Sequence, residues 1–484
     1  MHHLSSQLWR RKPVAPGGGH SGAGEGLARN LSTFQLTMFG VGATVGTGVF
    51  FVMHEAVPDA GPAVILSFLL AGFAAGLSAL CYAEMASAVP VSGSTYSYAY
   101  ATMGEVVAVG VAACLLLEYG VSTAAVAVGW SDYLNLLVSN VFGFGIPEVL
   151  TGGPFEGGVV NLPAVVLVGL CTLLLLRGVS ESATVNAVMV LVKLAVLLLF
   201  AAVAFTAFSA DNFADFAPNG AHGVTAAAGT IFFTFIGLDA VSTAGDEVKD
   251  PQKTLPRAII AALLIVVTIY LLVAVAALGT QPWTAFSDPD QAEAGLARIL
   301  ENVTGATWPG TLLAVGAVIS IFSVTLVVMY GQTRILFAIG RDGLAPRSLA
   351  TVHPRSRVPV RAVVTVAIAV ALLAGFLPLD ALWDLVSIGT LVAFITVSVG
   401  VIVLRRSRPD LPRGFRVPGY PVVPVLSVIA CLYILSGLHW TTYAWFVAWL
   451  AVVLGFYLVW GRHHAVLNRP AEADPATAGA GDVR

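Results

Sequence analysis

Long apolar segments separated by short polar connections dominate the 484-residue chain. A helix needs about 20 mostly apolar residues to cross the hydrocarbon core of a bilayer. We expect such spans at residues 33–56, 62–89, 105–137, 160–177, 183–207, 225–246, 257–278, 308–339, 360–378, 381–404, 420–438 and 441–461. The pattern predicts an all-α polytopic membrane protein with twelve transmembrane helices.

The positions of the basic residues test this map independently, because Lys and Arg accumulate in short cytoplasmic loops. With the amino terminus inside, all but two of the 24 basic residues fall in loops and tails on the inner side. The exceptions are Lys193, within the fifth span, and Arg298, in an outer loop. We therefore expect an integral protein of the cell (plasma) membrane with both termini in the cytoplasm.

Two segments outside the spans are expected to be tails. Residues 1–32 lack the apolar core and small-residue cleavage site of a secretory signal, so they predict a cytoplasmic tail. Residues 470–484 consist mainly of small, acidic and proline residues, which predicts a disordered C-terminal tail.

The first span contains four glycines in the nine residues from Gly40 to Gly48. Such a segment can unwind, which exposes backbone N–H and C=O groups that a bilayer tolerates only where they line a cavity or meet a ligand. An alternative is close helix packing, for which Gly42 and Gly46 have the right spacing.

A second interruption, at Gly237 and Asp239 in the sixth span, favours the hypothesis that the first span is unwound. If residues 33–207 and 225–404 are inverted repeats, spans one and six are equivalent, and paired broken helices at a repeat interface indicate a transport site. The sequence thus predicts a 5+5 inverted repeat with discontinuous helices 1 and 6. Residues 419–461 then form two peripheral helices.

The candidate substrate-binding residues at these breaks are Thr44, Gly46, Thr47, Gly48, Phe233, Ile236 and Gly237. The positive N-terminal end of the outer half-helix suits a carboxylate, and the free carbonyls of the breaks suit an ammonium group. A ligand that carries both groups is an amino acid.

Lys193 lies in the middle of the fifth span, where a lysine costs roughly 2.5–3.5 kcal/mol on insertion scales. One hypothesis is structural, with the lysine tying helices together. The other is proton coupling, in which the amine releases its proton when a gate closes and regains it when water enters. Its charge can also replace that of a coupling sodium ion.

Two acids inside the spans are further candidates for proton coupling. Glu118, on the third span, pairs with Lys193 or relays protons, reads the substrate side chain, or makes a structural hydrogen bond; the sequence leaves all three open. Asp239 either caps the broken helix or takes part in protonation of an inner gate.

Other polar residues fit less specific roles. Glu84 and Glu105 flank the cytoplasmic ends of spans two and three, where solvated or gate-forming acids are expected, and Asp132 and His439 are interpreted as structural. An inner loop after span eight supplies candidates for gate salt bridges or for a solvated face, namely Arg334, Arg341 and Asp342.

Several runs resemble permeases of the amino acid–polyamine–organocation (APC) superfamily and, within it, the cationic amino acid transporter family. These runs include GATVGTGVF, FTFIGLDAVST, EVKDPQKTLPRAI and GQTRILFAIGRDGLAP, and with WRRKPV, GWSDYL and residues 84–100 the resemblance covers nearly the whole chain.

The resemblance implies a LeuT-type fold and assigns roles within it. Thr47 and Gly48 would bind the substrate carboxylate, the carbonyls of Thr44, Phe233 and Ile236 its amino group, and Phe233 would also form an aromatic gate. Proton-coupled members place a lysine on span five beside the unwound part of span one. By this likeness, Lys193 would lie near Gly42 and Val45.

The sequence contains no nucleophile with a base, no metal-binding cluster and no phosphate-binding G-K-[ST] loop, so neither an enzyme, a cofactor, a metal site nor ATP-driven transport is expected. No basic stripe suggests nucleic-acid binding. The four separated cysteines, Cys81, Cys114, Cys171 and Cys431, are expected to be packing residues.

We therefore expect a secondary active amino acid transporter that works by alternating access, with protons and membrane lipid as its other partners. The resemblance favours symport of cationic amino acids such as arginine, lysine and ornithine. The alternatives are small neutral substrates such as alanine, and a non-transporting amino acid sensor. A channel is disfavoured because no selectivity motif is repeated.

Overall fold

The computed structural model describes residues 8–13, 27–287, 295–306, 308–377, 379–436 and 440–468. These residues form helices and connecting turns, with two isolated β-bridges and no strand among them. His439 and residues 470–484, for which the sequence predicts a structural role and a disordered tail, lie outside the described residues.

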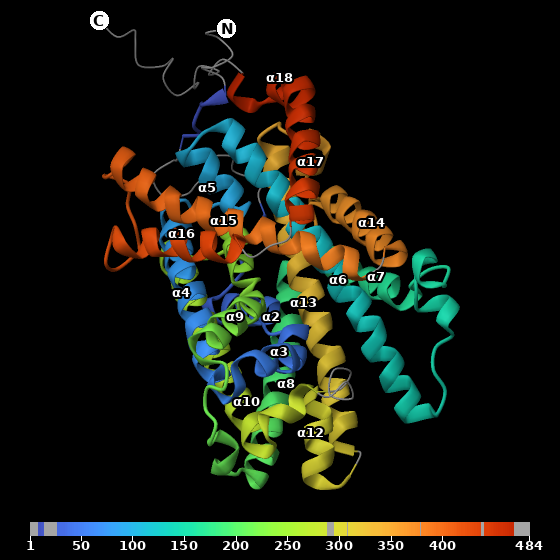
Figure 1. The fold of residues 1–484 in the computed structure, drawn as a ribbon. Coiled ribbons are helices and arrows are strands. Elements are labelled where there is room, and N and C mark those ends of the chain that lie inside the picture. The colour runs from blue at the N-terminus through green and yellow to red at the C-terminus, as the bar shows by residue number, and fades with distance from the viewer. Residues whose placement is uncertain are drawn as a thin grey trace, which may run out of the picture.

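The α-helices run in chain order through the bundle shown in Figure 1. They are α2 (Thr33–Thr44), α3 (Thr47–Ala60), α4 (Val64–Ala88), α5 (Ser94–Thr102), α6 (Glu105–Phe142), α7 (Leu162–Arg177), α8 (Val179–Ala204), α9 (Gly220–Phe232), α10 (Pro251–Thr280), α12 (Gly295–Thr304), α13 (Trp308–Arg341), α14 (Val360–Phe376), α15 (Leu379–Ser407), α16 (Val422–Leu435), α17 (Trp440–Phe456) and α18 (Arg462–His464).

Short 3-10 turns connect these helices, and one turn is π-helical. The 3-10 turns are η1 (Gly61–Ala63), η2 (Glu148–Leu150), η3 (Pro154–Glu156), η4 (Phe205–Ala207), η5 (Ala210–Phe213), η6 (Phe233–Phe235), η7 (Leu238–Thr243), η8 (Gly245–Glu247), η9 (Trp283–Ser287), η10 (Arg347–Ala350) and η12 (Val466–Asn468), and the π-helical turn is η11 (Tyr457–Gly461).

Eight helical segments among the described residues are long and apolar enough to cross a membrane, and α7, α14 and α16 are shorter apolar helices. The all-helical class is therefore confirmed. The helices do not by themselves establish twelve spans or the 5+5 repeat, so both remain predictions. The first expected span, for example, is divided between the short helices α2 and α3.

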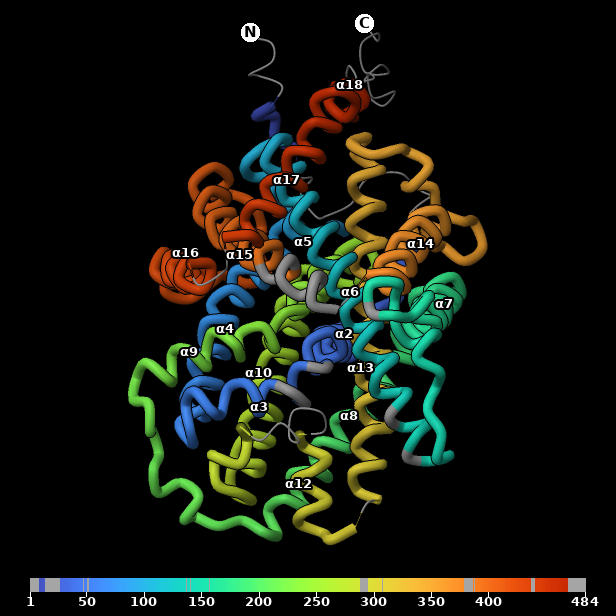
Figure 2. Tube along the Cα trace, turned by 45° about the vertical axis from the view of Figure 1, so that its right-hand side comes forward, coloured from blue at the N-terminus to red at the C-terminus, as the bar shows by residue number. Residues whose placement is uncertain are grey.

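The N-terminal half of the first interrupted span, α2, lies at the centre of the bundle. Helix α2 packs against α8, α10, α13 and η7, and Figure 2 shows α2 in the middle of the bundle with α8, α10 and α13 around it. A capping box fixes its start: the backbone N–H of Gln35 donates to the Ser32 hydroxyl oxygen (3.3 Å), and the Gln35 side chain accepts from the Ser32 N–H (3.1 Å).

The outermost helices carry the large exposed apolar side chains. On α17, Trp440 and Trp445 are 78% and 70% exposed, and α16 lies on the outside of the bundle in Figure 2. A water-soluble protein would bury such side chains, whereas a lipid environment accommodates them. The four cysteines are free and buried, as expected of packing residues.

Candidate functional site

The first break separates α2 from α3 at Val45 and Gly46. Val45 (φ −78°, ψ 88°) leaves the helical conformation after its N–H donates to the Val41 carbonyl, and Gly46 (φ −127°, ψ −141°) precedes the new helix. A Cβ atom at Gly46 would lie 2.7 Å from the Val324 side chain on α13. Glycine is therefore required by the close approach of α13 at this point.

The second break follows α9. The chain continues as the single turn η6, extends at Ile236 and turns at Gly237, whose φ of +103° favours glycine. A Cβ atom at Gly237 would lie 2.8 Å from the Ala43 carbonyl oxygen, and one at Gly48 would lie 2.9 Å from the Thr234 side chain. The predicted breaks therefore meet in space.

Partial exposure marks the meeting point of the two breaks. Gly48, Phe233 and Ile236 are partly exposed although most neighbouring residues are buried, and Thr44 and Gly46 are buried. The side chain of Thr47 lies outside the described residues, and its backbone begins α3. The structure thus brings the backbone of the seven candidate substrate residues to one region.

Lys193 reaches the first break from α8. Its ammonium group donates to the carbonyls of Gly42 (2.9 Å) and Val45 (2.6 Å), and it lies 3.5 Å from the Ser323 hydroxyl. Lys193 is 1% exposed, and Ser320 donates a further hydrogen bond to the Val45 carbonyl (3.0 Å). Lys193 therefore lies beside Gly42 and Val45, as the family resemblance implied.

Glu118 makes no ion pair with Lys193 in the part of the chain that the structure describes. Its Oε2 atom is buried and receives no hydrogen bond from the described residues. A Cβ atom at Gly389 would lie 3.0 Å from the Glu118 Cβ, so this acid packs against α15 rather than α8. Of the roles that the sequence left open for Glu118, direct pairing with Lys193 is not observed.

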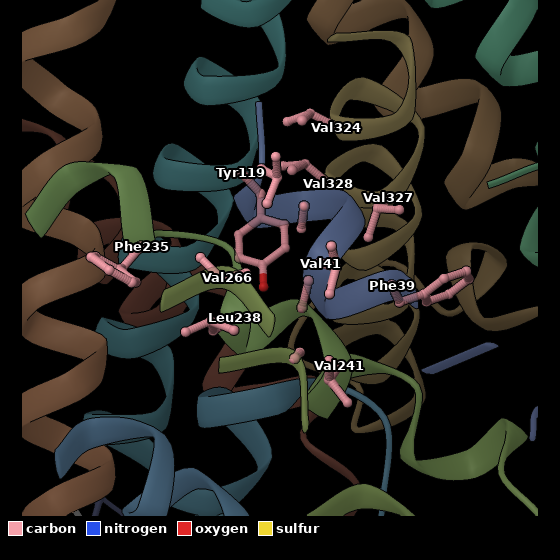
Figure 3. Packing of buried hydrophobic residues seen from close by; sticks show 14 of the residues in the cluster. Phe39, Val41, Tyr119, Phe235, Leu238, Val241, Val266, Val324, Val327 and Val328 are labelled. Carbon is pink, nitrogen blue, oxygen red and sulfur yellow. The ribbon is translucent and has the colours of Figure 1, made fainter. Parts of the chain in front are cut away.

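Asp239 lies beside a tyrosine of the third span. The Tyr119 hydroxyl donates to Asp239 Oδ2 (2.6 Å), while Oδ1 is buried and unpartnered among the described residues. Figure 3 shows the Tyr119 ring projecting between α13 valines, Val41 and Leu238. A small cavity borders the acid and is lined by Ala75, Ala79, Tyr82, Leu238, Asp239, Ile259 and Phe394.

Comparison with known proteins shows to which family the chain belongs. The sequence profile of the family described as amino acid permease matches residues 31–460. The chain belongs to the amino acid permease family. This membership confirms the APC resemblance and identifies an integral membrane transporter rather than an enzyme.

Relatives of this permease are named for different substrates. The methylthioribose transporter of Bacillus subtilis (strain 168) is 42% identical over 467 residues, which are 96% of this chain and 100% of that protein. The branched-chain amino acid permease BcaP of the same organism is 41% identical over 472 residues, again 96% and 100%. The vacuolar cationic amino acid transporter 2 of Arabidopsis thaliana is 38% identical over 414 residues, 83% of this chain and 64% of that protein.

At one end of the permease, a buried ion pair joins the segment after the second break to α13. Arg334 donates from Nε to Glu247 Oε2 (3.0 Å) and from Nη2 to Oε1 (2.8 Å), and Tyr330 also donates to Glu247. Arg334 lies within α13 and is 1% exposed, and Arg341 is the last residue of the same helix, so both belong to a helix rather than to the inner loop that the sequence suggested.

Neighbouring charges extend this cluster. Arg341 donates to Asp246 (2.7 Å); burial alone would raise the pKa of Asp246, but the guanidinium outweighs burial and lowers it. Asp342 pairs with Lys12 and accepts from the Tyr96 hydroxyl (2.9 Å). Of the two roles that the sequence left open for Arg334, Arg341 and Asp342, the structure shows salt bridges, and their part in a gate stays a prediction.

Glu84 and Glu105 are buried anchors rather than solvated acids. Glu84 is paired with Arg405 (2.5 Å) and Arg413 (3.5 Å), and accepts from the Val417 N–H. Glu105 accepts hydrogen bonds from the hydroxyl groups of Tyr100 (3.0 Å) and Tyr457 (2.8 Å) and from Arg10. Arg10 also donates to the Leu467 carbonyl, so the chain near both termini meets at one end of the bundle.

Several residues at the breaks or in the buried cluster around Arg334 were not singled out from the sequence, namely Asn186, Glu247, Tyr270, Ser320, Ser323 and Tyr330. Polar side chains in apolar spans commonly hydrogen-bond across helices, which is a usable signal for Asn186 and the serines. No sequence signal distinguishes Tyr270 from a packing aromatic.

Proposed function

We propose that this permease is a proton-coupled secondary transporter of amino acids in the cell membrane, working by alternating access with both termini in the cytoplasm. One observation carries the proposal: the Lys193 ammonium group is held on the free carbonyls of Gly42 and Val45 at the first break. A lysine there couples its protonation state to the conformation of the substrate-binding backbone.

The substrate binds at the meeting point of the two breaks in this proposal. The N–H groups that begin α3, at Thr47 and Gly48, receive the carboxylate, because a helix N-terminus attracts anions. The carbonyls of Thr44, Phe233 and Ile236 receive the ammonium group. The partial exposure of Phe233 and Ile236 supports this placement, since a ligand needs access to the backbone that binds it.

Cationic amino acids are the proposed substrates. Glu118 does not neutralise Lys193, and its Oε2 atom, which receives no hydrogen bond from the described residues, leaves a buried carboxylate available for a cationic side chain. Asp239 Oδ1 is a second buried acceptor of the same kind. A buried charge is stable only when it is paired, and a substrate such as arginine supplies the missing charge.

Neutral amino acids are the second candidate, favoured by a different observation. BcaP of Bacillus subtilis, named for branched-chain amino acids, is 41% identical and matched over its full length. The apolar surroundings of the breaks, such as Val41 and Leu238 in Figure 3, suit an apolar side chain as well. Alanine and leucine therefore accompany arginine in any test.

The test is uptake of labelled arginine and, separately, of labelled leucine into proteoliposomes, each in competition with the other and with lysine, ornithine and alanine. The cationic proposal predicts that Glu118→Gln weakens uptake of arginine about tenfold to a hundredfold while leucine uptake changes little, because a charge-assisted contact contributes about 1.5–3 kcal/mol. Glu181→Gln, an exposed acid at the start of α8, is the matched control.

Three outcomes separate the candidates. Leucine uptake with no competition by arginine favours the neutral candidate and refutes the cationic one. Equal loss of every substrate in Glu118→Gln assigns Glu118 to the framework or to proton relay. Binding of an amino acid without uptake identifies a sensor and contradicts the transport proposal.

A further inference from the structure

One tyrosine hydroxyl links the two broken spans. Tyr270 lies within α10, is 1% exposed, and its hydroxyl lies 2.9 Å from the Thr44 carbonyl oxygen and 3.0 Å from the Thr234 carbonyl oxygen. Thr44 is the last residue of α2, and Thr234 lies in η6 directly after α9. A single side-chain atom therefore contacts the free carbonyl end of each broken helix.

Counting protons shows that these carbonyls keep acceptor capacity. Both distances are those of hydrogen bonds, but a phenol has one O–H proton, whereas two carbonyl oxygens offer four lone pairs. Both carbonyls also lie at the C-terminal ends of helices, which carry partial negative charge. The neutral hydroxyl of Tyr270 holds the two oxygens together and leaves lone pairs for a cationic donor.

Packing fixes where this hydroxyl lies. The Tyr270 ring makes edge contacts with Phe68 on α4 (centroids 6.1 Å apart) and with Phe235 in η6 (5.3 Å). Both partners are 1% exposed. Because the ring is held by apolar contacts, removal of the hydroxyl alone would leave the ring in place.

Two side chains, those of Lys193 and Tyr270, bind different carbonyls of the unwound backbone at the first break. Lys193 takes the Gly42 and Val45 carbonyls, while the Thr44 carbonyl between them accepts from Tyr270 instead. The charge of Lys193 therefore does not satisfy the Thr44 oxygen. This oxygen is the one that the proposed function assigns to the substrate ammonium group.

We propose that Tyr270 is a positioning residue for the substrate ammonium site. Its hydroxyl ties the Thr44 carbonyl oxygen to the Thr234 carbonyl oxygen of the second break, and the ammonium group of an amino acid binds the lone pair of the Thr44 oxygen that Tyr270 leaves unused. The inference rests on the proposed function and adds to it a residue that recognises the amino group through the backbone, whatever the substrate side chain.

Tyr270→Phe tests this inference, with Tyr443→Phe as the matched control, because the Tyr443 hydroxyl also donates to a backbone carbonyl but lies on the peripheral helix α17. Two ligand pairs are compared in purified protein and in counterflow: leucine with 2-hydroxy-4-methylpentanoate, and arginine with its 2-hydroxy analogue. Each pair differs only in the ammonium group.

The expected result for Tyr270→Phe is a half-saturation concentration about tenfold to a hundredfold higher for the amino acid, with little change in the maximal rate, because hydrogen bonds to charged groups contribute about 1.5–3 kcal/mol. Affinity for the hydroxy acid changes little, so the preference for the amino acid falls by the same factor. Tyr443→Phe leaves both values near those of wild type.

Other results overturn the inference. An unchanged preference refutes it, whether both ligands weaken together, as a general structural role predicts, or neither weakens. A loss of maximal rate at saturating substrate also contradicts it. If wild-type protein binds no amino acid, the proposed function fails. If wild-type protein binds amino acids and Tyr270→Phe keeps the wild-type preference for the amino acid over the hydroxy acid, only the role of Tyr270 is refuted.

Discussion

Loss of one charge from the buried pair between Glu247 and Arg334 is expected to destabilise the protein strongly. The Glu247 side chain is 0% exposed and that of Arg334 is 1% exposed, with two donated hydrogen bonds of 3.0 and 2.8 Å between them. The guanidinium also donates to Thr333 (2.9 Å) and lies 4.2 Å from the centroid of the Tyr330 ring. Every one of these contacts is shielded from water.

Glu247→Gln leaves the Arg334 charge buried without a counter-ion. Removal of one partner from a buried pair typically costs about 3–5 kcal/mol, because the remaining charge is desolvated and unpaired. The exposed pair of Asp250 and Lys253 is the matched control: its side chains are 60% and 66% exposed and 3.7 Å apart, so Asp250→Asn should change stability little.

The assay is thermal unfolding of purified protein in detergent at neutral pH. We expect Glu247→Gln to melt well below wild type and Asp250→Asn to melt close to it. A double variant, Glu247→Gln with Arg334→Met, should recover part of the loss because no unpaired charge remains. Equal melting temperatures for Glu247→Gln and Asp250→Asn would refute the claim that the pair is desolvated.

Two further predictions concern the second break and its neighbouring charge. Gly237→Ala should lower the free energy of unfolding by roughly 1–3 kcal/mol and reduce substrate affinity, because Gly237 has a φ of +103° and a new Cβ atom would lie 2.8 Å from a backbone oxygen. The control is Gly229→Ala on α9, where a new Cβ atom meets open space. This variant should behave as wild type in the same binding and melting assays. Arg341 lowers the pKa of Asp246 against the effect of burial, so their pair stabilises the protein fully above about pH 4 and this contribution is lost as pH falls through the folded pKa. Asp246→Asn should therefore lower the melting temperature at pH 7 and have a diminishing effect below about pH 4; an effect that is equal at both pH values would contradict this.

The sequence predicts the places where the helices break better than it predicts what binds the exposed backbone. Glycines and an isolated lysine in apolar runs indicate both breaks and the importance of Lys193, because such residues are costly in a bilayer. Which carbonyls Lys193 meets depends on the conformation of Val45 and Gly46, which periodicity does not encode.

Long-range partners are the part that the sequence could not predict. Glu118 and Lys193 are both charged residues of apolar spans, yet Glu118 packs against α15 while Lys193 contacts α2. Tyr270 resembles any aromatic of an apolar helix until the two carbonyls are placed on its hydroxyl. Burial of Glu247 likewise follows from packing of η8 against α13, since in sequence it lies in a charged loop.

The central claim is that Lys193 couples proton movement to amino acid transport, and uptake into proteoliposomes with and without an inward proton gradient tests it most directly. Wild-type protein should accumulate labelled substrate only with the gradient. Lys193→Ala should lose this response yet retain substrate counterflow, which requires no net proton movement. Wild-type uptake that ignores the gradient, or a Lys193→Ala variant that the gradient still drives, would contradict the account.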